Sequence, residues 1–190
     1  LVGMFIVSSA ASGIRRDIEQ VQASARARSE AALARKRGEA KLLLTRDVQV
    51  SYDKVQVLFG VDIDIAAGEI VALLGTNGAG KSTLLKAISG VTEADRGAIV
   101  LDGRDITHAP PNEIAALGIA QLPGGHAIFP SLTVRENIEA SQWLATQEKQ
   151  SGTAEAEESL QLFPEILERW NEPAANLSGG QQQMLGLAMA

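Results

Sequence analysis

Nine consecutive residues constrain the folding of this chain more than any other part of its sequence. They are Gly75, Thr76, Asn77, Gly78, Ala79, Gly80, Lys81, Ser82 and Thr83, and they match the pattern G-x-x-x-x-G-K-[ST]. A continuous apolar run at residues 69–74 comes directly before them, and Leu84, Leu85 and Ile88 follow at helical spacing. We therefore predict a buried strand over residues 69–74, a glycine-rich loop, and a helix that Gly90 ends.

A loop of this kind, between a strand and a helix, is suited to binding phosphate. Its glycines let the backbone fold closely around phosphate oxygens, and the first N–H groups of the helix point at the anion. In this arrangement Lys81 reaches the β- and γ-phosphates of a nucleotide, and the Ser82 hydroxyl binds Mg²⁺. The alternative interpretation is a glycine-rich turn that carries an exposed lysine.

The residues before the loop predict an antiparallel pair of strands. Leu42, Leu44, Val48 and Val50 have a strand-like pattern, and apolar side chains alternate with polar ones over residues 57–65. The two segments are joined across Tyr52, Asp53 and Lys54. Further along, an apolar run at residues 98–101 ends in Asp102, but Gly103 follows it, and Asp-Gly is a hairpin turn signal. We therefore interpret Asp102 as a turn residue and not as a Mg²⁺ ligand.

Two later segments carry signals for the start of a helix. Thr133 with Glu136 forms a capping box, and so does Ser178 with Gln181, where the sequence reads Leu-Ser-Gly-Gly-Gln from Leu177. Taken alone, the second segment predicts a capped helix and nothing more.

The phosphate loop, followed about 100 residues later by Leu-Ser-Gly-Gly-Gln, resembles the ATP-binding cassette (ABC) ATPases over residues 41–190. The resemblance implies an α/β fold, namely a P-loop NTPase core (RecA-like) with an N-terminal antiparallel β subdomain and a helical subdomain at about residues 122–176. It also implies that ATP and Mg²⁺ are bound. Residues Ser178, Gly179, Gly180 and Gln181 then contact ATP that is held by a second cassette in a head-to-tail dimer.

The same resemblance assigns roles to two further residues. Tyr52 lies where the family has an aromatic residue that stacks on adenine; the alternative is a turn tyrosine. Gln121 follows the apolar residues 117–120 and matches the family's glutamine loop, which approaches Mg²⁺ and the attacking water. In the family, the Mg²⁺-binding Asp, the catalytic Glu and the switch His come after the signature. No apolar run ending in Asp-Glu follows Gln181 within the 190 residues. We therefore expect an ATPase in a full-length parent protein, and very slow ATP hydrolysis by this chain alone.

Residues 102–107, 117–123 and 128–134 look like the ATPase subunits of branched-chain amino acid importers. This resemblance implies a domain that powers solute transport at the cytoplasmic face of the cell membrane, in contact with permease domains. Gly124 and Gly125 depart from that pattern. The alternatives are an ATPase for lipid or lipopolysaccharide export, a soluble ABC ATPase without a transport role, and a non-catalytic interaction fragment.

The N-terminal segment differs from the rest of the chain. Residues 12–46 carry a net charge of +5, whereas the residues from Asp47 onward carry −11. The apolar residues 1–11 precede Arg15 and Arg16, an order that fits the cytoplasmic end of a membrane-spanning helix; an amphipathic or tag-like extension is the alternative. Residues 12–40 predict a basic linker helix, in which residues 17–37 form a solvated helix that Gly38 ends. Contact of this segment with anionic lipid headgroups is a second possibility.

Composition excludes several classes of site. There is no cysteine, which excludes disulfides and thiolate chemistry, and two histidines are too few for a multi-histidine metal centre. The aromatic content of 4% argues against a base-stacking surface, so we expect no nucleic-acid partner.

Overall fold

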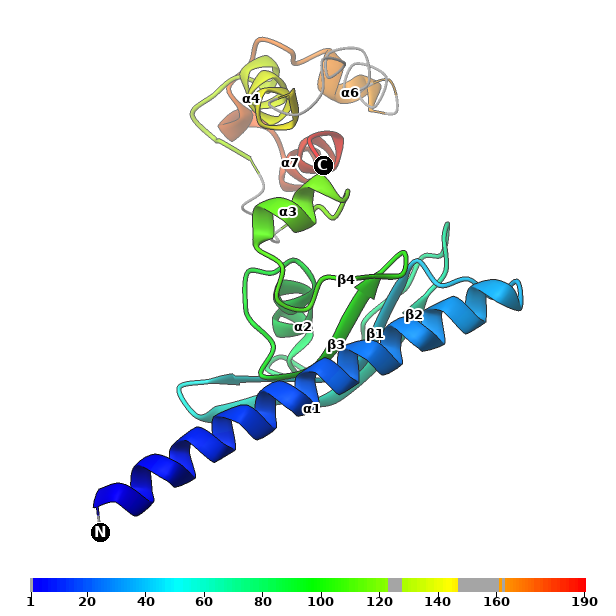
Figure 1. Cartoon of the computed structure of the whole chain (residues 1–190). Helices are drawn as coiled ribbons and strands as arrows, with labels where there is room; N and C mark the ends of the chain where they lie inside the picture. The colour runs from blue at the N-terminus through cyan, green and yellow to red at the C-terminus, as the bar shows by residue number, and fades with distance from the viewer. Residues whose placement is uncertain (1, 123–127, 147–160, 162) are drawn as a thin grey trace. The chain divides into compact units, whose positions relative to one another are not determined.

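An antiparallel sheet of four strands organises the first part of the chain (Figure 1). In this computed structural model, residues 2–122, 128–146, 161 and 163–190 are described, and the chain divides into two units, Leu1–Ile119 and Ala120–Ala190. The strands are β1 (Leu43–Tyr52), β2 (Val55–Ile65), β3 (Arg96–Leu101) and β4 (Arg104–Asp105), in the order β2-β1-β3-β4. The helices of this unit are α1 (Val2–Lys36), α2 (Lys81–Ile88) and α3 (Pro111–Ala116).

Two tight hairpins set the register of this sheet. Tyr52 pairs with Val55 across Asp53 and Lys54, whose φ angles are 47° and 71°. The β3–β4 turn is made by Asp102 and Gly103, with φ angles of 46° and 82°. Positive φ at both central residues is the geometry of the two-residue turns that match strand twist. The predicted strand pair and the turn role of Asp102 are therefore confirmed.

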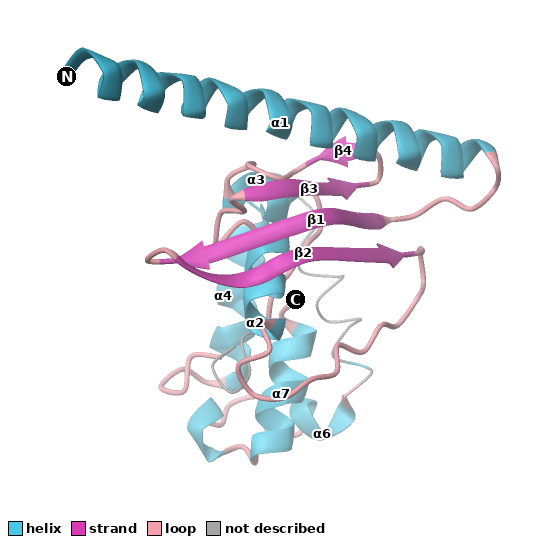
Figure 2. Cartoon of the chain, turned by 90° about the horizontal axis from the view of Figure 1, so that it is seen from below, coloured by secondary structure: helices cyan, strands magenta, loops and turns pink. Residues whose placement is uncertain are grey.

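Both faces of the sheet are covered by helices. On one face, α2 packs its buried Leu84 and Ile88 against the strands. On the other face lies α1, which runs along the sheet in Figure 2. Ala27 and Ala31 of α1 are 1% and 7% exposed. Residues 12–40 were expected to form a solvated linker, but the structure shows that their alanines let the helix approach the sheet closely. The sheet residues that face α2 include Leu43, Val48, Val50, Leu58 and Ile99. Those that face α1 are Leu44, Ala98 and Val100.

The N-terminal residues 1–11 were expected to be the end of a membrane helix. Residues from Val2 onward belong to α1, which continues to Lys36, and Gly38 follows it with a φ of 78°. None of the helices in the described part of the chain has the length and apolar character needed to cross a membrane.

The strand predicted over residues 69–74 is absent. This segment forms no ladder, and Ile70 and Leu74 are 99% and 91% exposed. A strand inside a parallel sheet needs neighbouring strands for its backbone hydrogen bonds, and all four described strands pair antiparallel with one another. Within the described residues the segment therefore has no partner, and only Leu73 packs against the core.

The second unit is helical. Its elements are α4 (Val134–Thr146), α6 (Pro164–Leu167), the 3₁₀ turn Ala174–Asn176 and α7 (Gly179–Ala188). Both predicted capping boxes are confirmed. Thr133 N donates to Glu136 Oε2 at 2.8 Å and Glu136 N to Thr133 Oγ1 at 3.2 Å. Ser178 N donates to Gln181 Oε1 at 3.0 Å, and Gln181 N to Ser178 Oγ at 3.3 Å. The core of the unit contains Val134, Ile138, Ile166, Ala174, Leu177, Leu185 and Ala188.

One buried amide ties the start of α4 to the preceding loop. Asn137 is fully buried. Its Oδ1 accepts from Phe129 N at 2.7 Å, and its Nδ2 donates to the carbonyls of Phe129, Leu132 and Thr133 at 2.9, 3.3 and 2.9 Å. Because leucine would leave these backbone groups without their side-chain partner next to a buried position, Asn137→Leu is expected to destabilise this unit by about 2–3 kcal/mol.

Urea denaturation followed by tryptophan fluorescence measures this effect, since Trp143 and Trp170 both lie in the second unit. The control is Asn171→Leu. Asn171 is exposed, so this substitution makes the same chemical change at the surface. Equal midpoints for the two variants would contradict the expectation.

Candidate functional site

The phosphate loop of residues 75–83 ends in the first turn of α2. Gly80 is the N-cap of this helix, with a φ of 86°, and no side chain caps the helix. The first N–H groups of a helix have no partner within it, so those of α2 remain available to an anion, with the positive end of the helix dipole behind them. The sequence places no acidic residue in this turn. The start of α2 is therefore electrostatically suited to phosphate.

Lys81 folds back over the loop. Its Nζ donates to the carbonyl oxygens of Gly75 and Thr76, each at 2.8 Å. Since an ammonium group has three donors and these bonds use two, the charge already lies over the loop and retains a donor for a phosphate oxygen. Ser82, the predicted Mg²⁺ ligand, is exposed, whereas Thr83 is buried.

Gly80 also fixes how the loop meets the sheet. A Cβ atom on this residue would lie 2.7 Å from Leu58 Cδ2 and 3.5 Å from Val57 Cγ1. The loop backbone thus rests directly on β2, and its left-handed φ favours glycine as well. This close approach connects the position of the phosphate loop to the position of the sheet.

Tyr52 stands beside the same helix. Its Oη lies 3.3 Å from Thr92 Oγ1, and this hydrogen bond, together with a weaker one to Thr83, lowers the pKa of the phenol. Thr83 is in the first turn of α2, so the structure brings the predicted adenine residue next to the helix that starts at the phosphate loop. The ring is 41% exposed. Thr92 was not predicted, because a single threonine in a turn carries no motif.

The remaining predicted residues belong to the second unit. Gln121 lies close to its beginning, and Ser178, Gly179 and Gly180 start α7 with exposed backbone. The amide of Gln181 is used in the capping box, so its side chain serves the helix start. The N–H groups of Gly179 and Gly180 lie in the first turn of α7, where the helix itself supplies no acceptor, and a Cβ atom at either residue would have nothing within 4 Å. Gly124 and Gly125 lie outside the described residues.

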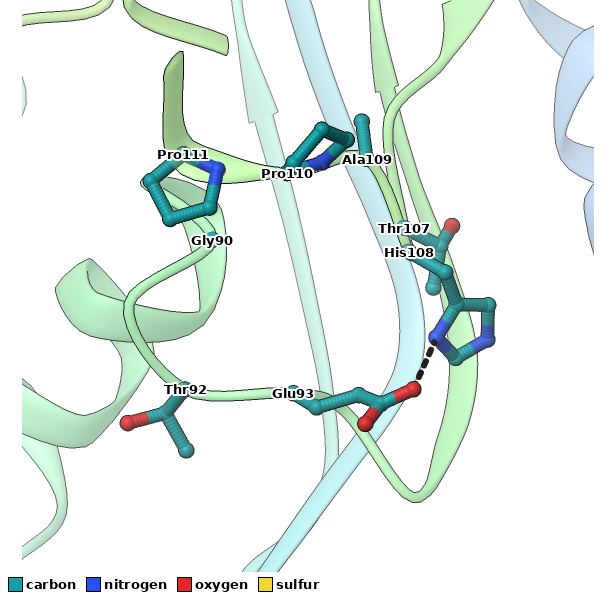
Figure 3. Close-up of a pocket in the computed structure, with 8 residues that line it drawn as sticks. All are labelled: Gly90, Thr92, Glu93, Thr107, His108, Ala109, Pro110 and Pro111. Atoms are coloured by element: carbon teal, nitrogen blue, oxygen red, sulfur yellow. Dashed lines mark ion pairs between the residues drawn. The ribbon is translucent and has the colours of Figure 1, made fainter. Parts of the chain in front are cut away.

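A separate hollow of about 220 Å³ lies beyond the C-terminal end of α2 (Figure 3). In it, His108 Nδ1 lies 3.1 Å from Glu93 Oε1, which joins the loop after α2 to the loop before α3. The other lining residues are Gly90, Thr92, Thr107, Ala109, Pro110 and Pro111. In the part of the chain that the structure describes, no three His, Cys, Asp or Glu residues are grouped to hold a metal ion.

Comparison with known proteins decides the family. Residues 58–190 match the family model described as ABC transporter. The chain belongs to the ABC transporter family. The matched region includes the phosphate loop and the start of α7, so the sequence resemblance and its α/β fold class are confirmed.

Relatives in this family are named as ATP-binding proteins of transport or import systems. The chain is 39% identical over 149 residues to the probable branched-chain amino acid transport ATP-binding protein LivF of Archaeoglobus fulgidus, covering 78% of the chain and 62% of the relative. It is 38% identical over 143 residues to BraG of Pseudomonas aeruginosa, a high-affinity branched-chain amino acid transport ATP-binding protein (75% and 60%). It is 40% identical over 152 residues to XylG of Sulfolobus acidocaldarius, a xylose/arabinose import ATP-binding protein (78% and 61%). The chain thus spans about three-fifths of the length of these relatives.

Solved structures agree with this ABC assignment. The ADP conformation of an ATP-binding cassette from an ABC transporter matches with a TM-score of 0.65 and 26% identity, over 78% of this chain and 63% of that one. An ATP-binding subunit of an ABC transporter matches with a TM-score of 0.65 and 30% identity, over 78% and 61%.

Proposed function

We propose that this ABC chain binds ATP with Mg²⁺ at residues 75–83 and contributes this site to the ATP hydrolysis that powers solute transport. The observation that carries the proposal is the start of α2, which has no side-chain cap and is overlaid by the Lys81 ammonium group. In this site Lys81 and the N–H groups of the loop hold the β- and γ-phosphates, and Tyr52 contacts the adenine. Ser82 would bind Mg²⁺, which would neutralise charge on the phosphates, and the family resemblance proposes Gln121 as a further Mg²⁺ ligand.

A second cassette completes the proposed site. The N–H groups of Gly179 and Gly180 at the start of α7 resemble those at the start of α2 in having no acceptor within the helix, and Ser178 is the N-cap residue beside them. We propose that they contact the γ-phosphate of ATP bound by the partner in a head-to-tail dimer, and that the pair sits on permease domains at the cytoplasmic face of the membrane. The names of LivF and BraG support this role in a transport system.

Branched-chain amino acids are the proposed class of transported solute. LivF and BraG support this choice, together with the sequence of residues 102–107 and 128–134. The similar identity to XylG, a sugar import protein, is consistent with a cassette whose ATP site is common to several transport systems.

The proposal is tested by titrating the purified chain with ATP and with AMP in the presence of Mg²⁺, using calorimetry. Both nucleotides offer the same adenine and ribose, but AMP lacks the phosphates that Lys81 reaches. ATP is therefore expected to bind more than about 100-fold more tightly than AMP. Equal affinity for the two nucleotides, or no binding of ATP, would overturn the proposed function.

A further inference from the structure

α1 is built to fit one face of the sheet. Its residues Ala27 and Ala31 are buried against Leu44, Ala98 and Val100, which form an apolar cluster separate from the one beneath α2. Small side chains on both sides allow close contact between helix and sheet, and the cluster is continuous across β1 and β3. α1 lies before the residues that match the family, so the family's ATP chemistry does not account for this contact.

Polar contacts fix the register of the helix on the sheet. Glu30 binds Arg46 of β1 through two bonds, at 2.6 and 3.0 Å. Gln20 Nε2 donates to the Gly97 carbonyl of β3 at 2.7 Å. Burial alone would raise the pKa of Asp105 in β4, but hydrogen bonds from Ser24 of α1 and from Thr107 outweigh it and hold that pKa below its usual value. α1 therefore contacts three strands through matched groups.

β2, the strand next to β1, supports the phosphate loop. Arg46, which holds Glu30, also binds Asp64 of β2 at 2.6 Å. β2 carries Leu58, the side chain on which Gly80 rests, and Leu58 is 4% exposed. A chain of direct contacts thus runs from α1 through Arg46 and β2 to the loop. A change in the position of β2 relative to β1 would move the surface that supports Gly80.

We infer that α1 is a positioning element for the nucleotide site: its docking on the sheet holds β1 and β2 in the arrangement that supports the phosphate loop, and its release weakens nucleotide binding. This inference rests on the proposed function, because it concerns ATP affinity. It adds a role for a segment outside the phosphate loop. Since the effect is transmitted through packing, releasing α1 is expected to weaken Mg-ATP binding about five- to tenfold.

The test uses the full chain with Ala27→Glu and Ala31→Glu combined, which places two charged side chains at buried positions of the interface. The matched control is Ala25→Glu with Ala32→Glu, which makes the same changes at exposed positions of the same helix. Ala27→Ser with Ala31→Ser keeps the side chains small and is expected to retain docking and affinity. Hydrogen–deuterium exchange of α1 and β3 reports docking, and calorimetric titration with Mg-ATP reports affinity.

Faster exchange in α1 together with weaker ATP binding, in the buried variant only, supports the inference. Faster exchange with unchanged ATP affinity overturns it, as does an equal loss of affinity in the exposed control. If the double variant does not fold, Glu30→Gln is measured in the same two assays. This substitution removes one charge of the Glu30–Arg46 ion pair without adding bulk. Failure of the unmodified chain to bind ATP overturns the proposed function instead, and the exchange data still show whether α1 is docked.

Discussion

Replacing Gly97 with alanine is expected to destabilise the first unit by about 3–5 kcal/mol. Gly97 lies in β3 with a φ of 96°, beside the point where the register of β1 shifts between Arg46 and Gln49. A Cβ atom here would lie 2.5 Å from the Arg46 carbonyl oxygen and still closer to that of Asp47. Both neighbours are backbone atoms, so no side chain can move aside to make room. The substitution therefore adds a steric clash to the cost of a left-handed conformation.

The control for this substitution is Gly103→Ala. Gly103 has a similar φ of 82°, but nothing lies within 4 Å of a Cβ atom there. It is expected to cost about 1–2 kcal/mol, the conformational part alone. Hydrogen–deuterium exchange of β1 and β3 amides measures both effects, and tryptophan fluorescence serves as an internal reference because both tryptophans lie in the second unit. Equal protection in the two variants would show that the close contact at Gly97 carries no energy.

The features of the fold that were predicted correctly are those encoded by neighbouring residues. The alternation in β2, the turn at Asp102 and Gly103, and the capping boxes at Thr133 and Ser178 each depend on residues within a few positions of one another. The features that were missed depend on contacts between residues that no short motif links. Asn137 gives no local sign that it will bind the Phe129 loop.

Local sequence patterns mispredicted the burial of two segments, α1 and residues 69–74, with opposite errors. An alanine-rich, charged helix has few large apolar residues and so predicts a solvated helix, yet Ala27 and Ala31 are buried because Ala98 leaves space for them. Residues 69–74 have the pattern of a buried strand, but burial requires neighbouring strands, and the described residues provide none. A hydrophobic pattern predicts that a segment can be buried, but burial also requires a packing partner from another part of the fold.

In the candidate site, the motif predicted the phosphate loop but not the residues that pack around the site. The loop residues and Lys81 follow from the spacing of glycines, lysine and serine, because those residue types are required for phosphate contact. Leu58 beneath Gly80 and Thr92 beside Tyr52 carry no residue-type signal of their own. They become recognisable only once the sheet brings β2 and the loop after α2 next to the site.

Lys81→Ala is expected to weaken Mg-ATP binding about 100-fold. The ammonium group is held over the loop by the carbonyls of Gly75 and Thr76 at 2.8 Å, so it lies where the phosphates are proposed to bind. Alanine removes its charge and donors while favouring the helix. Circular dichroism is therefore expected to remain unchanged while calorimetric titration shows the loss, which separates binding from folding.

The charge-matched control is Lys36→Ala, which removes an exposed cation from the last turn of α1. Long-range attraction between a cation and ATP is screened beyond about 8 Å at physiological ionic strength, so only a lysine in contact with the phosphates should change affinity by two orders of magnitude. AMP affinity is expected to be almost equal in Lys81→Ala and the unmodified chain, because AMP lacks the β- and γ-phosphates. A parallel loss for ATP and AMP would mean that Lys81 shapes the whole loop and does not contact the terminal phosphates.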